Sequence, residues 1–112
     1  MPLLVAIVIG VLLARSLCAQ PECQRLAVVK YRATPVCLDA MQYADTSKSS
    51  WIRGAWYDAK NAYLVISLNG TLYHHCRVPD GVWTGLQGAS SHGKYFNANI
   101  KGRFDCRMGG VP

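Results

Sequence analysis

The chain has 112 residues, 12 of them Lys or Arg and six Asp or Glu, which gives a formal charge of +6 at pH 7. This length suffices for one small domain and rules out a polytopic membrane protein. A hydrophobic content of 51%, densest in the first 19 positions, also excludes a collagen-like fibre and a disordered chain.

Residues 1–19 are predicted to be a signal peptide. Residues 2–14 form an uncharged apolar run, which is shorter than the ~20 residues of a membrane-spanning helix but typical of a signal-peptide core. Cleavage is expected after Ala19 or after Cys18. No Lys or Arg precedes the run, which leaves a retained membrane anchor as one alternative. A lipoprotein modified at Cys18 is another. Cleavage would leave an exported protein, periplasmic or extracellular, with no membrane span.

Residues 20–48 are predicted to form an N-terminal arm, in which residues 26–31 resemble a strand that ends at Thr34-Pro35. Beyond a polar loop, strands are expected at residues 51–57, 62–68 and 71–78. Asn69-Gly70 joins the last two strands and is a strong hairpin signal, because both turn positions require a positive φ. The pattern predicts a three-stranded antiparallel meander.

One or two short helices are predicted after the meander. Pro79-Asp80 ends the third strand and offers an N-cap, and apolar residues then recur on one helical face, at Val82, Trp83 and Leu86. Residues 88–93 interrupt this helix, and residues 94–101 form the second one, which Gly102 ends. Residues 103–106 are expected to be extended. The predicted fold class is therefore α+β, a three-stranded antiparallel meander covered by one or two short helices, with a disulfide-tied N-terminal arm.

Four cysteines remain once Cys18 is assigned to the leader, and an even set in a short exported chain predicts two disulfides. No paired CxxC or HxxxH spacing of the kind that holds zinc is present. Four cysteines allow three pairings, among which the spacing alone does not choose. We predict Cys23–Cys37 and Cys76–Cys106, because the first pair brackets a strand that turns back and the second returns the last segment to the sheet. A crossed pairing such as Cys23–Cys106 would clamp the arm across the sheet.

Several short motifs follow one another at a characteristic spacing: Ser49-Ser50, Tyr57-Asp58, residues 64–70, Tyr73, Val78-Pro79, Ser90, residues 93–97 and Ile100-Lys101. Their order resembles the KTSC domain, a small module named for its occurrence at the C-terminus of some lysyl-tRNA synthetases. The leader, the cysteines and the ending at residues 104–107 are similar to short exported members of that family. Where the family has Tyr-x-Tyr, the chain has Tyr73-His74-His75. The resemblance implies a KTSC-like domain with a C-terminal tail over residues 49–112, and RNA binding is suggested for the family.

The residue types of a Ser–His–Asp hydrolase are present in His74, His75, His92, Ser90, Ser91 and Asp80, but the G-x-S-x-G elbow is absent. Neighbouring residues of a strand point to opposite faces, so at most one of His74 and His75 could join a single site. The carboxylates of the KTSC-like half lie at predicted turns or caps, at Asp58, Asp80 and Asp105. Paired general acid–base catalysis therefore lacks candidates, and we predict no catalytic residue, no cofactor and no metal.

Basic residues interleaved with aromatic ones are the stronger functional signal. Aromatic rings that stack with cations on a sheet hold single-stranded nucleic acids, and the same groups suit other polyanions. Tyr73, His75 and Arg77 share one face of their predicted strand by its period of two. The candidate ligand-binding residues are these three together with Lys94, Tyr95, Asn97, Lys101 and Arg103. The alternative is that the aromatic residues fill the core and the charges keep the domain soluble.

We therefore expect a small exported KTSC-like protein that is a non-catalytic binding module for an anionic ligand, such as a nucleic acid or another polyanion. A module that binds a protein partner or stabilises the cell envelope is the alternative, and an enzyme of unrecognised activity is the third reading.

Overall fold

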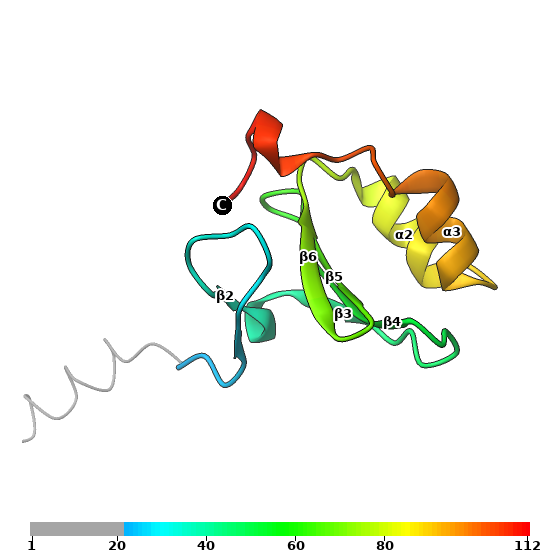
Figure 1. The fold of residues 1–112 in the computed structure, drawn as a ribbon, viewed down its shortest axis with the longest axis horizontal. Coiled ribbons are helices and arrows are strands. Elements are labelled where there is room, and N and C mark those ends of the chain that lie inside the picture. The colour runs from blue at the N-terminus through cyan, green and yellow to red at the C-terminus, as the bar shows by residue number, and fades with distance from the viewer. Residues whose placement is uncertain (1–21) are drawn as a thin grey trace, which may run out of the picture.

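A computed structural model of the chain describes residues 22–112, so the predicted leader lies outside the described part (Figure 1). The elements in chain order are β1 (Leu26–Ala27), β2 (Val36–Cys37), the 3-10 helix η1 (Leu38–Ala40), β3 (Gln42–Ala44), β4 (Ile52–Asp58), β5 (Tyr63–Leu68), β6 (Thr71–His75), α2 (Asp80–Gly88), α3 (His92–Asn99) and the 3-10 helix η2 (Cys106–Met108). None of the helices between residues 22 and 112 combines the length and the hydropathy that a bilayer crossing requires.

The central sheet has four antiparallel strands in the order β3-β4-β5-β6. The hairpin predicted at Asn69-Gly70 joins β5 to β6, and these residues have φ angles of 53° and 91°. Both values lie in the left-handed region that a tight hairpin turn of this kind requires. The α+β class and the meander of β4, β5 and β6 are therefore confirmed.

The predicted three-strand count is wrong, because β3 extends the sheet at the edge formed by β4. Tyr43 pairs with Trp56 and Ala44 with Ala55. Three residues are too few for an alternating pattern to be recognised in the sequence. Two tertiary contacts hold them instead, since Ala44 is buried in the core and Trp83 of α2 donates a hydrogen bond from Nε1 to Oε1 of Gln42 over 3.0 Å.

The N-terminal residues form a second, two-stranded sheet in which Leu26 pairs with Cys37 and Ala27 with Val36. The strand predicted at residues 26–31 is thus only two residues long. Val29 leaves the ladder to become buried in the core, and Tyr31 turns the chain with a φ of 68°. The disulfide Cys23–Cys37 closes this hairpin at a Cα–Cα distance of 5.8 Å, as predicted.

Helices α2 and α3 begin earlier than the sequence pattern predicts. Asp80, expected as an N-cap, is the first residue of α2, and Pro79 occupies the cap position. Ser91 caps α3 by accepting a hydrogen bond from the backbone N–H of Lys94 over 3.2 Å, so the helix starts at His92. Gly93, expected to interrupt the helices, lies in the first turn of α3. The Trp51 indole packs against it there, and a Cβ at this position would come within 2.8 Å of the ring.

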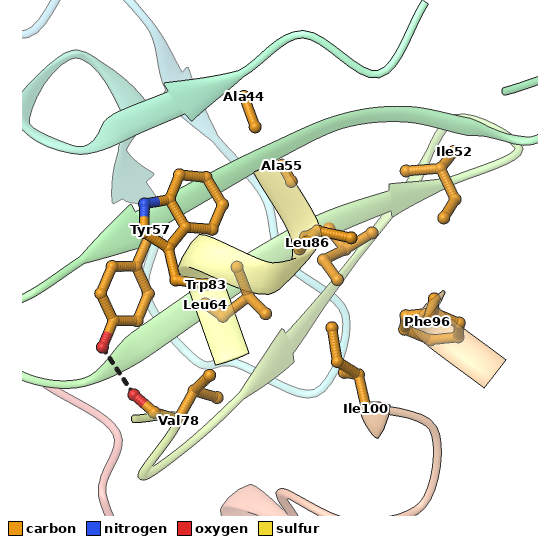
Figure 2. Close-up of a cluster of buried hydrophobic side chains, with 11 residues drawn as sticks. Ala44, Ile52, Ala55, Tyr57, Leu64, Val78, Trp83, Leu86, Phe96 and Ile100 are labelled. Atoms are coloured by element: carbon orange, nitrogen blue, oxygen red, sulfur yellow. Dashed lines mark hydrogen bonds between the residues drawn. The ribbon is translucent and has the colours of Figure 1, made fainter. Parts of the chain in front are cut away.

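One face of the sheet packs against α2 and α3 around a large apolar core (Figure 2). The side chains of Ile52, Leu64, Leu86 and Ile100 are fully buried there. Tyr57 also lies in this core and donates a hydrogen bond from its hydroxyl to the carbonyl oxygen of Val78 over 2.6 Å. Burial and the nearby carboxylate of Asp80 raise the pKa of Tyr57 to about 12, so its hydroxyl stays protonated and remains a donor.

The opposite face of the sheet packs against the N-terminal residues, which Figure 1 shows on the side away from α2 and α3. The segment predicted as an arm therefore covers this face and contributes β3. This second core is smaller and contains Val29, Leu38, Trp56, Tyr63, Val65 and Cys76. The sheet is thus covered on both sides.

The C-terminal residues return to β6, and the predicted disulfide Cys76–Cys106 ties them there with a Cα–Cα distance of 5.0 Å. β6 ends at His75 rather than at Val78, because the N–H of Cys76 bonds to the carbonyl of Phe104 and Arg77 has a φ of 57°. Residues 103–106, expected to be extended, form turns that lead into η2.

Candidate functional site

A cavity of about 310 Å³ lies between the loop that precedes β4 and the start of α3. Residues 48–51 form one wall, and residues 90–94 with Asn97 form the other. The lining includes Ser49, Ser50, Ser90, Ser91, Lys48 and Lys94. We call this site the serine–lysine cavity.

Local hydrogen bonds shape the two walls of the serine–lysine cavity. Ser49 turns the loop into β4 by accepting, at its Oγ, the backbone N–H groups of Trp51 and Ile52 over 3.4 and 3.0 Å. Ser91 caps the facing helix α3. The Trp51 ring bridges the walls, because it packs on Gly93 and meets Phe96 edge to face at 5.7 Å.

The electrostatics of the serine–lysine cavity favour an anion. Its lining contains Lys48 and Lys94 but no Asp or Glu, and it includes the first turn of α3, where backbone N–H groups and the helix dipole attract negative charge. Asp45 is the neighbouring carboxylate. Hydrogen bonds from Ser47 lower its pKa most, and the nearby His92 and Lys48 lower it further. This acid lies outside the cavity lining, but its charge acts on two of the lining residues.

His92 adds a second polar group to this site. The residue is only 7% exposed, yet it borders the cavity. Among the hydrogen bonds of residues 22–112, none involves its ring nitrogens. A buried imidazole usually has a partner, so this one offers hydrogen-bonding capacity to a molecule in the cavity.

The structure separates the predicted ligand-binding residues. Lys94 and Asn97 line the serine–lysine cavity. Tyr95 instead joins the two helices, because its hydroxyl donates a hydrogen bond to the Val82 carbonyl over 3.0 Å. Lys101 is exposed just beyond α3 and lines neither cavity described here.

The remaining predicted ligand-binding residues also lie in different places. Tyr73 lies on β6, where the ammonium of Lys30 is 5.5 Å from its ring centroid. The guanidinium of Arg77 donates a hydrogen bond to the Met108 carbonyl over 2.7 Å. His75 and Arg103 line a second cavity of about 680 Å³. We call this second site the tail cavity; it is bounded by Tyr31, His74, His75, residues 102–107 and Val111.

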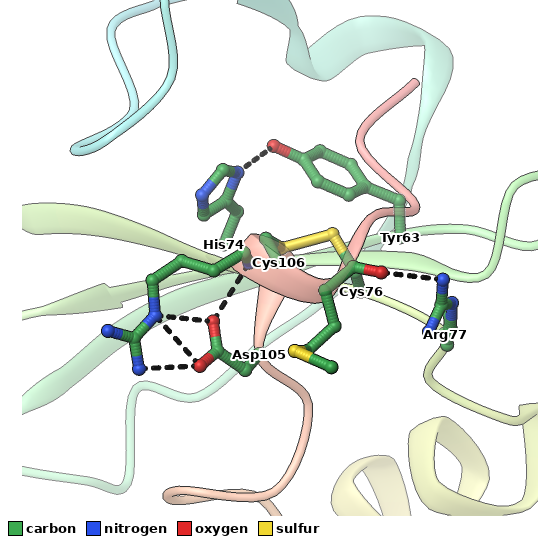
Figure 3. Close-up of a disulfide and its surroundings, with 8 residues drawn as sticks. Tyr63, His74, Cys76, Arg77, Asp105 and Cys106 are labelled. Atoms are coloured by element: carbon green, nitrogen blue, oxygen red, sulfur yellow. Dashed lines mark hydrogen bonds and ion pairs between the residues drawn. A yellow bond between two sulfur atoms is a disulfide. The ribbon is translucent and has the colours of Figure 1, made fainter.

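Both His74 and His75 border the tail cavity, which corrects the expectation that only one of them could join a single site. Their side chains leave β6 on opposite faces, as the strand period requires, but β6 is an edge strand and the C-terminal residues fold over its end. His74 faces the N-terminal side, where its Nδ1 is 2.7 Å from the hydroxyl of Tyr63 (Figure 3). His75 faces the helices and meets Phe96 at 5.8 Å.

Burial makes His75 hard to protonate. Desolvation, with a smaller contribution from neighbouring His74, lowers the pKa of His75 to about 4. Its Nε2 is shielded from solvent and has no partner among residues 22–112, so a proton there would add a charged donor without an acceptor. The pKa of His74 is also lowered, by burial first and by the charge of Arg32 second.

Two other sets of side chains have the residue types of a metal site and of a serine–histidine pair, but their contacts differ from both. Cys23, Cys37 and Asp39 have the spacing of metal ligands, but the two sulfurs are bonded to each other and Asp39 accepts the backbone N–H groups of Gln24 and Arg25. Within residues 22–112, no serine hydroxyl is hydrogen-bonded to a histidine ring.

Most of the serine–lysine cavity was missed as a binding site in the sequence. Lys48, Trp51 and His92 carry no binding motif that could have identified them. A usable signal was nonetheless present, because Ser49-Ser50 and the stretch from Ser90 to Lys94 are among the residues that carry the family resemblance. The structure brings these two motifs, about 40 residues apart, to facing walls of one cavity.

Comparisons with known proteins agree on the family. The family model described as the KTSC domain matches residues 48–104. The crystal structure of a KTSC domain protein from Yersinia pestis is similar to this chain, with 34% sequence identity, a TM-score of 0.54, and coverage of 59% of this chain and 93% of that one. Among curated proteins, no sequence matches.

Proposed function

This chain belongs to the KTSC domain family, and we propose that it is a non-catalytic module that binds an anionic ligand in its serine–lysine cavity. The observation that carries this proposal is the lining, which combines two lysines, four serines and the start of a helix with no acidic residue. Such a set provides N–H and O–H donors together with positive charge, which is the chemistry that holds phosphate and carboxylate groups.

The size and placement of the cavity support the same proposal. A volume of about 310 Å³ lies at the lower end of the range for small-molecule sites, so it suits one anionic group and its immediate substituents. The matched family region, residues 48–104, contains every residue of the lining. A larger polyanion would place one charged group in the cavity and extend over the exposed side of α3, past Asn97 towards Lys101.

We also propose that the protein is exported. Its two disulfides are typical of proteins from oxidising compartments, and the apolar leader supplies a route out of the cytoplasm. Cleavage after Ala19 or Cys18 would release the domain into a periplasm or the extracellular space. Intact mass of the exported protein tests this, with a start at or near Gln20 expected and an intact Met1 in the membrane fraction as the contradicting result.

A salt titration tests the binding proposal. Affinities for a short single-stranded oligonucleotide and for an anionic glycan are measured from low to physiological salt, with both disulfides formed. For a single-stranded oligonucleotide, each lysine that contacts a phosphate contributes about 0.7 to the slope of log K against log salt concentration. The double substitution Lys48→Gln and Lys94→Gln should therefore reduce that slope by about 1.4.

Lys60→Gln is the matched control, because this exposed lysine lies in the turn at the opposite end of β4 from the cavity. The slope of log K against log salt concentration for this variant should equal that of the unmodified protein. A change in the control of about half that in the double variant would contradict the site, since it would report only the number of charges removed. Absence of binding at low salt would contradict anion recognition altogether and favour the protein-partner alternative.

A further inference from the structure

The tail cavity is a second concave site, and the proposed function does not use it. Four separated segments surround it: the turn at Tyr31, the end of β6, residues 102–107 and the C-terminal Val111. Its volume of about 680 Å³ lies within the usual range of small-molecule sites. It shares no lining residue with the serine–lysine cavity.

Covalent and hydrogen bonds hold the walls of the tail cavity in place (Figure 3). The disulfide Cys76–Cys106 fastens the returning segment to the end of β6, and the Cys76 N–H bonds to the Phe104 carbonyl over 3.1 Å. Arg77 fixes the tail beyond the disulfide by bonding the Met108 carbonyl. The cavity is therefore formed before a ligand arrives, which lowers the entropic cost of binding.

One side of the tail cavity is apolar and its rim is exposed. Tyr31 is 80% exposed and Val111 is 44% exposed, and Phe104 lies between the cavity and the core. Tyr31 also has a φ of 68°, which is unfavourable for an aromatic residue. Residues held in such strained backbone conformations cluster at functional sites. The ammonium of Lys30 lies 5.2 Å from the centre of the Tyr31 ring.

The other side of the tail cavity carries one unbalanced positive charge. Asp105 and Arg107 neutralise each other at 2.7 Å, and this is the one ion pair found in residues 22–112. Arg103 lines the cavity and has no acidic partner in that part of the chain. A guanidinium presents two parallel donors that match the two oxygens of a carboxylate.

His74 adds a polar group to this charged side. Its Nδ1 shares a hydrogen bond of 2.7 Å with the hydroxyl of Tyr63, and the guanidinium of Arg32 lies 5.2 Å from the centre of the Tyr63 ring. The cavity thus combines an apolar rim with Arg103, a cation that has no acidic partner among residues 22–112.

From this combination we infer that the tail cavity binds a small aromatic carboxylic acid, with its ring against Tyr31 and Phe104 and its carboxylate on Arg103. The aromatic body follows from the exposed Tyr31 ring, which offers an offset stacking surface. The carboxylate follows from Arg103, which lines the cavity and has no acidic partner among residues 22–112. This inference is independent of the anion-binding function proposed for the serine–lysine cavity.

A nuclear magnetic resonance titration of the disulfide-bonded protein with three probes tests the inference. Phenylacetate carries both the ring and the charge, phenylacetamide carries the ring alone, and acetate carries the charge alone. Phenylacetate should shift the amide signals of residues 31, 74–75 and 103–107, and bind about tenfold or more tightly than either partial probe. Equal affinity for phenylacetamide or acetate, or shifts confined to residues 48–51 and 90–97, would overturn the inference.

Two substitutions sharpen the titration. Arg103→Gln should weaken phenylacetate about tenfold and leave phenylacetamide unchanged, because only the charge is lost. Tyr31→Asn removes the ring while asparagine tolerates the positive φ, and it should weaken both aromatic probes severalfold. Lys101→Gln is the control, since this lysine is close in sequence to Arg103 but lies outside the cavity lining. Loss of affinity in the control equal to that in Arg103→Gln would refute the assignment.

Discussion

The face of the sheet that packs against the helices and the face that packs against the N-terminal residues differ in what holds them in place. On the helix face, eleven buried residues form one apolar core. On the opposite face, six buried residues form the core, and both disulfides and the cation–π contacts of Arg25 and Arg32 lie on that side. A small apolar core commonly requires such crosslinks. The face with fewer buried residues is therefore stabilised more by crosslinks and less by apolar packing.

The largest effect is expected from a substitution in the helix-face core. Leu86 is fully buried between α2 and the sheet, so Leu86→Ala should lower the free energy of unfolding by roughly 3–5 kcal/mol through lost burial and a residual cavity. Urea denaturation monitored by tryptophan fluorescence measures this loss. A loss below that caused by removing a disulfide would contradict the view that packing dominates this face.

Removing the disulfides should destabilise the opposite face. The sequence separation is 30 for Cys76–Cys106 and 14 for Cys23–Cys37. The loop-entropy model then gives losses of roughly 3.5 and 3 kcal/mol for the respective double replacements by Ala. Urea denaturation of the two variants measures which replacement lowers the free energy of unfolding more. Non-reducing peptide mapping of the unmodified protein is the control, and a crossed peptide or four free thiols would contradict the pairing.

A single replacement in the second disulfide has a chemical consequence as well. Cys106→Ser leaves the Cys76 thiol unpaired beside His75, and the loss of stability should be about 2–5 kcal/mol. Alkylation of native protein measures the exposure and reactivity of that thiol. No alkylation of Cys76 in the folded variant would show that the second core still shields it.

Acid should reveal a difference between the two histidines of β6. The unfolded chain protonates His75 near its ordinary pKa of 6.5, whereas the folded protein does so only at about 4. The unfolded state therefore binds more protons between these values, and stability falls as the pH falls from 6.5 to 4, by roughly 3 kcal/mol in total. His75→Gln should flatten this dependence, as measured by urea midpoints between pH 7 and pH 4.5.

His74→Gln is the matched comparison for the acid experiment. Its ring is more exposed, and its pKa is lowered less by burial. The pH dependence of stability should therefore change less than in His75→Gln. A larger change at His74 would mean that the N-terminal face shields its histidine better than the helix face does.

The smallest effect on stability is expected from exposed lysines. Lys94 and Lys101 are both exposed, so replacing both by Ala should leave the melting temperature nearly unchanged. Anion binding and its salt dependence should fall, because Lys94 borders the serine–lysine cavity. A large fall in melting temperature would instead assign these lysines a structural role.

Local patterns allowed a good part of the fold to be predicted. Asn69-Gly70 set the β5–β6 hairpin because its φ preference acts within four residues. The candidate site was less accessible, since only Lys94 and Asn97 of the predicted surface line the serine–lysine cavity. Tyr95, read as a ligand contact, bonds the Val82 carbonyl between the helices. A sequence pattern indicates which face of an element a residue shares but does not identify the segment that covers that face.

The sequence by itself determined the α+β class, the hairpin and the helices that follow it, because each depends on turn preferences or periodicity. The cysteine pairing was predicted from the expected order of the elements, since the spacing left three pairings open. Only the tertiary structure decided that residues 42–44 join the sheet, that both His74 and His75 reach one cavity, and that residues 48–51 face residues 90–97. These arrangements arise from contacts between segments far apart in the chain. Such contacts depend on how the whole core packs, and no local pattern encodes that packing.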